Sequence, residues 1–264
     1  MRLPIYQVDA FASEVFHGNP AAVCPLERWL PEATMQSIAA ENNLAETAFF
    51  VPRHGGAPDG DYDLRWFTPE AEVDLCGHAT LASAFVVFTA LDRAREAVTF
   101  HTRSGPLVVR RDGEALAMDF PARPPVACEA PMGLVAALGR APLEVWKSRD
   151  VMAVYESEDA VRSLAPSFDG VRALGVFGII ATAPGRDVDF VSRFFAPLMG
   201  VPEDPATGSS HCTLTPYWAK RLGKSRLRAR QVSARVGELL CEDLGERVAI
   251  AGRAVQYLEG TIEV

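Results

Sequence analysis

The sequence predicts an α+β protein of two similar lobes, each a curved, mostly antiparallel sheet wrapped around a central buried helix. The first observation is a repeated segment, because residues 65–69 (RWFTP) and 193–197 (RFFAP) both combine a basic residue, two aromatics, a small residue and a proline. Each copy leads to a glycine-containing turn, at 76–80 (CGHAT) and 204–209 (DPATGS). The second observation is the segment 78–91, which is apolar on all faces, so a helix there must be enclosed. Duplication predicts one turn from each lobe at a shared cleft, with the active site between the lobes.

The first lobe is expected to span residues 1–120. A helix begins at Pro31, since proline suits the first helical turn, and ends at Asn42-Asn43. The Gly-rich segment 55–60 is expected to be a surface turn. Alternating or β-branched runs predict strands at 3–9, 21–24, 44–51, 63–67, 97–102, 106–111 and 114–120.

The second lobe is expected to span residues 121–255. Residues 121–131 are rich in proline, which favours a stiff linker between the lobes. A helix should follow the second glycine turn, continue to about Leu222 and stop at Gly223, with Pro216 kinking it or marking the start of its regular part. Other helices are expected near 132–139 and 158–164, strands near 150–155, 174–182 and 188–195, and a strand-rich tail from 228 to 264.

Composition excludes several classes of function. The net charge of −8 argues against a nucleic-acid surface. The N-terminus lacks the apolar core of a signal peptide, and the longest apolar run, 82–91, is too short to span a bilayer. Five cysteines form no Cys-x-x-Cys pair, which fits a reducing cytoplasm and argues against a structural zinc site. We therefore expect a cytoplasmic protein with neither a nucleic-acid nor a membrane partner.

Two residues of the first lobe could carry proton chemistry. Glu46 leads into the apolar run 48–51, so in a closed cleft desolvation would raise its pKa toward neutrality; the alternative is a charged residue at a strand edge. His78 lies just inside a helix N-terminus, where the helix dipole disfavours the imidazolium; the alternative is a structural histidine near the cap.

The second glycine turn is rich in small hydrogen-bond donors. Asp204 and Ser209 flank it, and Thr207 and Gly208 lie within it, although helix capping alone would explain one or two of these residues. The N–H groups of two such helix starts would make an anion site without any lysine or arginine. Cys76 could be a nucleophile, because a helix start lowers a thiol pKa, but a two-thiol racemase needs an opposing cysteine and the second turn has none.

These motifs together resemble the PhzF-like (phenazine biosynthesis-like) isomerase family, which has the diaminopimelate epimerase-like fold. The resemblance covers essentially the whole chain. Its markers are residues 8–11 (VDAF), 18–20 (GNP), 43–47 (NLAET), 67–69 (FTP), 76–79 (CGHA), 203–209 (EDPATGS) and 260–262 (GTI).

The resemblance implies a cofactor-independent isomerase, with no metal, that moves a proton on a small carboxylate substrate. Glu46 matches the family's catalytic acid/base, and His78, Asp204 and Ser209 match the residues that hold and polarise the substrate. Gly77, Thr207 and Gly208 are then expected to bind the substrate. A homodimer is also implied, as is a return of the last strand, 256–264, to the first lobe.

Three functions remain open at this point. The isomerisation of trans-2,3-dihydro-3-hydroxyanthranilate, a phenazine precursor, is one candidate reaction among several for the isomerase. A cysteine-dependent racemase or epimerase of an amino acid would use Cys76 instead of Glu46. A protein that binds a small carboxylate without catalysis is the third.

Overall fold

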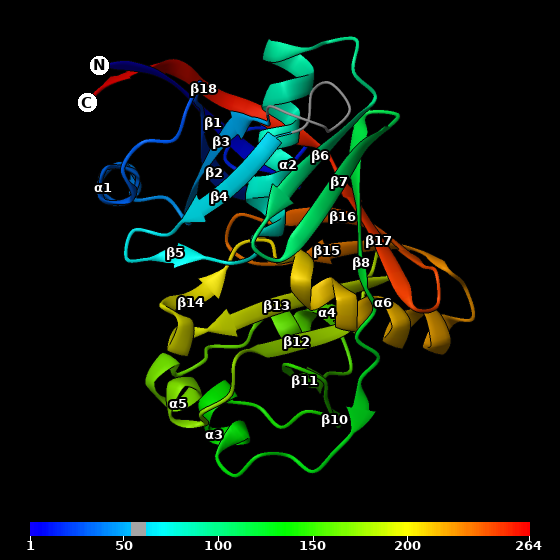
Figure 1. Cartoon of the computed structure of the whole chain (residues 1–264). Helices are drawn as coiled ribbons and strands as arrows, with labels where there is room; N and C mark the ends of the chain where they lie inside the picture. The colour runs from blue at the N-terminus through cyan, green and yellow to red at the C-terminus, as the bar shows by residue number, and fades with distance from the viewer. Residues whose placement is uncertain (54–61) are drawn as a thin grey trace. The chain divides into compact units, whose positions relative to one another are not determined.

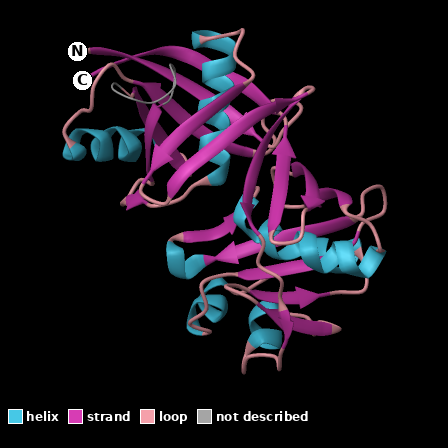
Figure 2. Cartoon of the chain, turned by 45° about the vertical axis from the view of Figure 1, so that its right-hand side comes forward, coloured by secondary structure: helices cyan, strands magenta, loops and turns pink. Residues whose placement is uncertain are grey.

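The computed structural model describes residues 1–53 and 62–264 (Figure 1). The chain forms two compact units: unit 1 contains Met1–Asp119 and Ala251–Val264, and unit 2 contains Phe120–Ile250. The chain passes from unit 1 to unit 2 at the start of the proline-rich segment, and it returns to unit 1 just before the last strand. Strands hold more residues than helices in both units (Figure 2). The turn expected at 55–60 lies outside the described residues.

The sheet of unit 1 has the strand order β18-β1-β2-β3-β4-β6-β7-β8, and the short β5 also pairs with β4. Only the β2/β3 and β4/β6 pairs are parallel. The last strand lies against the first along its whole length, from Arg2 opposite Glu263 to Ala10 opposite Ala254. The bounds are β1 Arg2–Ala10, β2 Asn19–Pro25, β3 Glu46–Pro52, β4 Tyr62–Phe67, β5 Glu72–Val73, β6 Ala97–Thr102, β7 Gly105–Asp112, β8 Ala115–Pro121 and β18 Ala254–Glu263.

Helices cover both faces of this sheet. Helix α1 (Glu32–Asn42) places Met35 and Ile38 in one cluster with Ile5 and Phe49. Helix α2 (Gly77–Val86) lies against β1, β2 and β3 and contributes nothing to that cluster, so it covers the opposite face. Eight of its ten residues are buried, as the apolar pattern predicts, and the helix continues as a π-helical turn, Val87–Leu91.

The sheet of unit 2 has the strand order β9-β10-β11-β12-β13-β15-β16, and the short β14 also pairs with β13. One face packs against α3, α4 and α5, and α6 contacts β15 and β16. The bounds are β9 Val126–Ala127, α3 Leu134–Leu138, β10 Glu144–Lys147, β11 Val151–Val154, α4 Glu158–Arg162, α5 Phe168–Ala173, β12 Ile179–Pro184, β13 Phe190–Ala196, η2 Pro197–Met199, β14 Val201–Asp204, α6 Gly208–Leu222, β15 Arg226–Gln231, β16 Gly237–Asp243 and β17 Arg247–Gly252.

The two sheets repeat one topology. In unit 1 the pairs from β1 through β2, β3, β4 and β6 to β7 are antiparallel, parallel, antiparallel, parallel and antiparallel. The pairs from β10 through β11, β12, β13 and β15 to β16 follow the same sequence. In both units a short strand and then a buried helix follow the fourth strand, as β5 and α2 or as β14 and α6. The predicted fold class of two sheets, each with a central helix, is confirmed.

Several elements differ from expectation. The strand expected at 174–182 begins only at Ile179, because the turn that ends α5 continues to Gly175, whose φ is +65°. The expected linker contains β9, and the short strands β5, β10 and β14 were not predicted from residue patterns. Pro216 lies inside α6, which runs through it to Leu222. In the described ranges, every helix is too short or too polar to cross a membrane.

Candidate active site

In unit 1, three polar side chains from separate segments meet at the start of α2. Glu46 is the first residue of β3 and shares a sheet face with Ala48 and Phe50, the face that α2 covers. Its Oε2 lies 3.0 Å from Nε2 of His78, which is in the first turn of α2. On the other side of the imidazole, Asn19 Nδ2 lies 3.2 Å from Nδ1. Asn19 begins β2, next to β3, so the sheet places both neighbours of His78.

The Glu46–His78 contact is an ion pair without an aligned hydrogen bond. Both side chains are largely buried, and Glu46 Oε2 and His78 Nε2 make no hydrogen bond of acceptable geometry within the described residues. Charge attraction depends on distance and little on direction, so the ion pair holds at 3.0 Å. The two atoms face each other in a space that the protein encloses.

The pair fixes the charge state of both groups. Burial is the largest influence on the Glu46 carboxyl and raises its pKa, but the charge of His78 and the polar contacts with His78 and Cys76 together outweigh burial, so the pKa lies below its ordinary value. Burial lowers the pKa of His78, but Cys76 and Glu46 raise it well above its ordinary value. Each group thus favours the charged form of the other, carboxylate for Glu46 and imidazolium for His78. The directions expected from the sequence, a raised Glu46 pKa and a neutral His78, are wrong, because each group is the other's counter-charge.

Cys76 lies beside the same imidazole, with its Sγ 3.5 Å from His78 Nδ1. Burial raises its thiol pKa to about 11, so the thiol is neutral at pH 7. The sequence expectation of a lowered pKa fails, because the side chain is buried next to the Glu46 carboxylate.

Glu46, Cys76 and His78 each offer a ligand atom, and these atoms lie within 4.8 Å of one another. However, the sulfur approaches Nδ1 of the imidazole and the carboxylate approaches Nε2. An ion bound to Nδ1 would lie on the opposite side of the ring from the carboxylate, and an ion bound to Nε2 would lie on the opposite side from the sulfur. This arrangement therefore suits proton chemistry better than a metal site.

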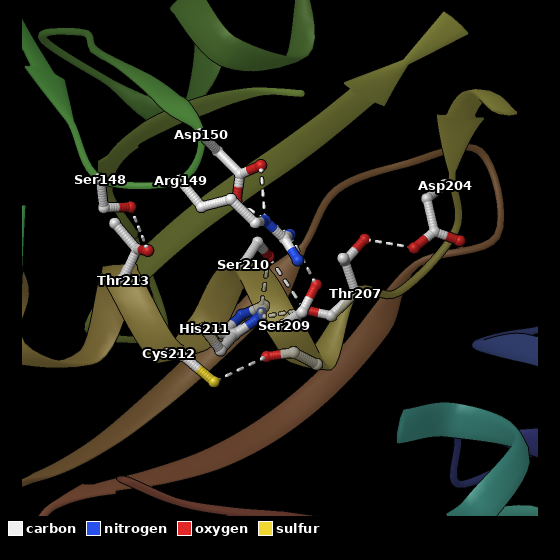
Figure 3. A network of polar contacts seen from close by, with 11 residues as sticks. Ser148, Arg149, Asp150, Asp204, Thr207, Ser209, Ser210, His211, Cys212 and Thr213 are labelled. Carbon is white, nitrogen blue, oxygen red and sulfur yellow. Dashed lines mark hydrogen bonds and ion pairs between the residues drawn. The ribbon is translucent and has the colours of Figure 1, made fainter. Parts of the chain in front are cut away.

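In unit 2, the second glycine turn forms a polar network around the start of α6 (Figure 3). The Thr207 hydroxyl donates to the Asp204 carboxylate. The buried Gln231 joins the two residues, because its Nε2 donates to the Asp204 carbonyl at 2.6 Å and its Oε1 accepts from the Thr207 amide at 2.9 Å. Gln231 ends β15, so the sheet fixes this turn as it fixes the Glu46 site in unit 1.

Ser209, in the first turn of α6, accepts a hydrogen bond from Arg149 Nη2 at 3.2 Å (Figure 3). Sequence reasoning missed Arg149 and expected an anion site without basic side chains. Arg149 lies between the helix predicted near 132–139 and the strand predicted near 150–155, 60 positions from Ser209 in sequence. No local pattern connects residues so far apart. The nearby His211 is fully buried and structural, with Nδ1 2.8 Å from the Thr207 carbonyl and its pKa lowered to about 4 by burial.

The repeated arginines hold the two glycine turns in the same way. Arg65 binds Glu72 through two hydrogen bonds of 2.6 and 2.7 Å, and Arg193 binds Glu203 through two of 2.7 and 2.8 Å. Each guanidinium also lies over the aromatic ring two residues along its strand, 5.2 Å from Phe67 or 5.0 Å from Phe195. The glutamates belong to β5 and β14, the short strands that lead to α2 and α6.

The predicted site residues thus form two groups. Glu46, Gly77 and His78 lie at the start of α2 in unit 1, and Asp204, Thr207, Gly208 and Ser209 lie at the start of α6 in unit 2. Asn19 and Gln231 were missed as site residues. Asn19 belongs to the family marker 18–20, and Gln231 to the predicted strand-rich tail. That one pocket is lined by Glu46, His78, Asp204 and Ser209 stays a prediction.

Comparison with known proteins gives matches over the whole chain. A family model described as phenazine biosynthesis-like protein (PhzC-PhzF) matches residues 8–260. An uncharacterized isomerase of Pseudomonas aeruginosa is 54% identical, with 100% of both chains covered. The crystal structure of a PhzF-family phenazine biosynthesis protein from Enterococcus faecalis is 49% identical, with a TM-score of 0.96 and 100% of both chains covered. A predicted epimerase from Pseudomonas aeruginosa shares the fold, with a TM-score of 0.75 at 21% identity and 99% of both chains covered.

Proposed function

Because the chain belongs to the phenazine biosynthesis-like (PhzC-PhzF) family, as its motifs predict, we propose that it is a cofactor-independent isomerase in which Glu46 moves a proton on a small carboxylate substrate. The observation that carries the proposal is the state of Glu46. It is a buried carboxylate, 3.0 Å from a positively charged His78, and its Oε2 has no aligned hydrogen bond in the described part of the chain. Such a group is a base ready to accept a proton from a ligand.

The proton transfer needs no external oxidant or reductant. Glu46 takes a proton from a carbon next to an activating group, and the electron pair of the broken C–H bond enters the conjugated system of the substrate. The protonated Glu46 then delivers the proton to a second carbon, and the double bond shifts. Negative charge thereby moves from Glu46 to the substrate and back, and the nearby His78 imidazolium offsets it in both places.

The remaining predicted residues bind the substrate in this proposal. The backbone N–H groups of Gly77 and His78 start α2, and those of Gly208 and Ser209 start α6, so all four lie at helix ends that favour anions. Asp204 and Thr207 are held by Gln231 and supply polar groups beside the second of these ends. We propose that both groups of residues contact the same substrate.

The test is hydrogen exchange in D₂O, followed by proton NMR over a panel of small unsaturated, α-hydroxy and α-amino carboxylates. Wild-type protein should exchange a carbon-bound hydrogen of at least one compound. Glu46→Gln should reduce that rate by about 10²–10⁴, whereas the exposed Glu27→Gln should leave it unchanged. An undiminished rate in Glu46→Gln contradicts the proposal, and binding without any exchange would favour the non-catalytic carboxylate-binding protein.

A further inference from the structure

Arg149 presents its guanidinium at the start of α6 from the turn between β10 and β11 (Figure 3). Its Nε and Nη2 donate to the two carboxylate oxygens of Asp150 at 3.2 and 3.0 Å. Nη2 also donates to Ser209 Oγ at 3.2 Å. The centre of the Phe177 ring lies 4.1 Å from the guanidinium carbon. The guanidinium is therefore packed against an aromatic ring on one face, while its edge makes the hydrogen bonds to Asp150 and Ser209.

The surroundings fix this guanidinium in advance. The Asp150 side chain is 0% exposed, and Arg149 is its ion-pair partner, with the charge of Arg123 adding to the attraction. The turn itself is joined to α6, because Ser148 Oγ lies 2.8 Å from Thr213 Oγ1. Gly178 lets Phe194 and Asp150 pack closely, since a Cβ there would lie 2.4 Å from the Phe194 ring and 3.3 Å from Asp150 Oδ1.

One nitrogen of the guanidinium is left for a ligand. Nη2 uses one N–H for Asp150 and one for Ser209, whereas Nη1 makes no hydrogen bond to any residue in the described ranges. The Arg149 side chain is 30% exposed, so solvent or a ligand can reach it. The two N–H groups of Nη1 can each donate to a ligand oxygen, and such a bond is roughly twice as strong to a charged carboxylate oxygen as to the neutral oxygen of an amide.

We propose that Arg149, together with Ser209, binds a carboxylate group of the substrate and selects it over neutral analogues. The inference rests on the proposed function. It assigns the binding of the substrate carboxylate to a side-chain cation, in addition to the N–H groups at the helix ends. The Asp150 carboxylate offsets part of the charge of Arg149, and the N-terminus of α6 adds to the attraction for an arriving carboxylate. The guanidinium then discriminates between carboxylate and amide, because its hydrogen bond to a charged oxygen is the stronger one.

The test is the ratio of affinities for a carboxylate and its primary amide, measured by calorimetry with three pairs: trans-2-butenoate, benzoate and L-2-aminobutanoate, each against its amide. Removing Arg149 alone would leave Asp150 buried and unpaired. The informative variant is therefore Arg149→Gln with Asp150→Asn, which replaces a neutral ion pair with a neutral amide pair. Arg149→Lys keeps the charge without the planar fork. Arg226→Gln is the control, because that arginine lies in the same unit with a side chain that is 83% exposed.

The wild type and Arg226→Gln should prefer the carboxylate in at least one pair. The Arg149→Gln/Asp150→Asn variant should lose about tenfold or more of that preference, and Arg149→Lys should fall between. A purely structural Arg149 would instead leave the ratio unchanged in the double variant. That result, or a wild type without preference in all three pairs, overturns the inference. Binding does not depend on turnover, so repeating the ratios in Glu46→Gln separates this outcome from a failure of the proposed proton transfer.

Discussion

Glu46 Oε2 and His78 Nε2 lie 3.0 Å apart. Glu46 begins strand β3, and His78 is in the first turn of α2, the helix that the sheet of β3 encloses. Each residue by itself would be an unfavourable buried charge. Together they keep a carboxylate ionised where water is largely excluded, and that is the state from which a general base must act. The pair is therefore both a stabilising contact and the chemical centre of unit 1.

The first prediction is a pH window for this stabilisation. The pKa of Glu46 is lowered from 4.5, so its contribution is present above pH 4.5 and is lost as pH falls through the lowered value. The pKa of His78 is raised above 6.5, so its contribution is present below pH 6.5 and is lost as pH rises through the raised value. The difference in Tm between the wild type and His78→Gln should therefore be greatest between pH 4.5 and 6.5.

His211 is a second buried histidine, and its pKa is shifted in the direction opposite to that of His78, so His211→Gln is the comparison variant. Burial lowers the pKa of His211 to about 4, so its neutral form stabilises the protein fully above pH 6.5 and less at lower pH. The Tm difference for His211→Gln should thus persist on the alkaline side, where the difference for His78→Gln declines. Parallel curves for the two variants from pH 4 to 9 would show that Glu46 and His78 are not a charged pair.

The sequence predicts the architecture well because the repeated motif has a structural cause. Arg65 and Arg193 each clamp a glutamate of the short strand before a central helix, and Phe67 and Phe195 lie under them. A local pattern of residues can reveal such a unit, since the arginine, aromatic, proline and glycine positions are close together in the chain. The matching order of parallel and antiparallel pairs in the two units follows from the same repetition.

The site was less predictable because its chemistry depends on residues that are distant in sequence. Glu46 could be selected, yet the direction of its pKa shift depends on His78, and burial alone gives the wrong sign. Arg149 and Gln231 reach the α6 turn from other strands, 60 and 24 positions away from Ser209 and Thr207. Such contacts depend on the order of strands in the sheet. Residue patterns did not predict that order, because they did not reveal the short strands β10 and β14.

The second prediction distinguishes Glu46 from Cys76 as the reactive group. The Cys76 thiol has its pKa raised to about 11, and Cys212 of α6 also has its pKa raised to about 11, by burial. Cys76→Ser should therefore keep the exchange rate within about tenfold, because no thiolate takes part. Iodoacetamide at pH 7.5 should modify Cys128 first, since it is the partly exposed cysteine. Loss of activity in step with modification of Cys76, or an inactive Cys76→Ser, would favour the cysteine-dependent racemase.

The third prediction concerns the two repeated arginines. Lysine cannot reproduce their paired hydrogen bonds, so Arg65→Lys and Arg193→Lys should each lower the free energy of unfolding by about 1–3 kcal/mol. Arg226→Lys is the matched control. The Arg226 side chain is 83% exposed and contacts Glu242 through a single pair of atoms at 3.0 Å. Its effect should stay within about 0.5 kcal/mol. Equal effects in urea denaturation of all three variants would mean that the repeated pairs are ordinary surface contacts.

The last prediction uses two glycines with nearly the same backbone conformation. Gly18 has φ +63° and Gly113 has φ +60°, so an alanine at either position has a comparable backbone strain of about 1–2 kcal/mol. A Cβ at Gly113 would meet nothing within 4 Å, whereas a Cβ at Gly18 would lie 2.1 Å from the Ala10 carbonyl oxygen. Gly18→Ala must therefore move the backbone next to Asn19, whose amide nitrogen is 3.2 Å from His78 Nδ1.

We expect Gly18→Ala to destabilise the protein by at least about 2 kcal/mol more than Gly113→Ala, because overpacking adds to the strain. The exchange rate should fall only in Gly18→Ala, since the displaced Asn19 would no longer orient the imidazole that holds Glu46. The two effects can be separated by measuring exchange well below the Tm of each variant, where both are folded. A folded Gly18→Ala protein with the wild-type rate would show that Asn19 does not position His78 for the reaction.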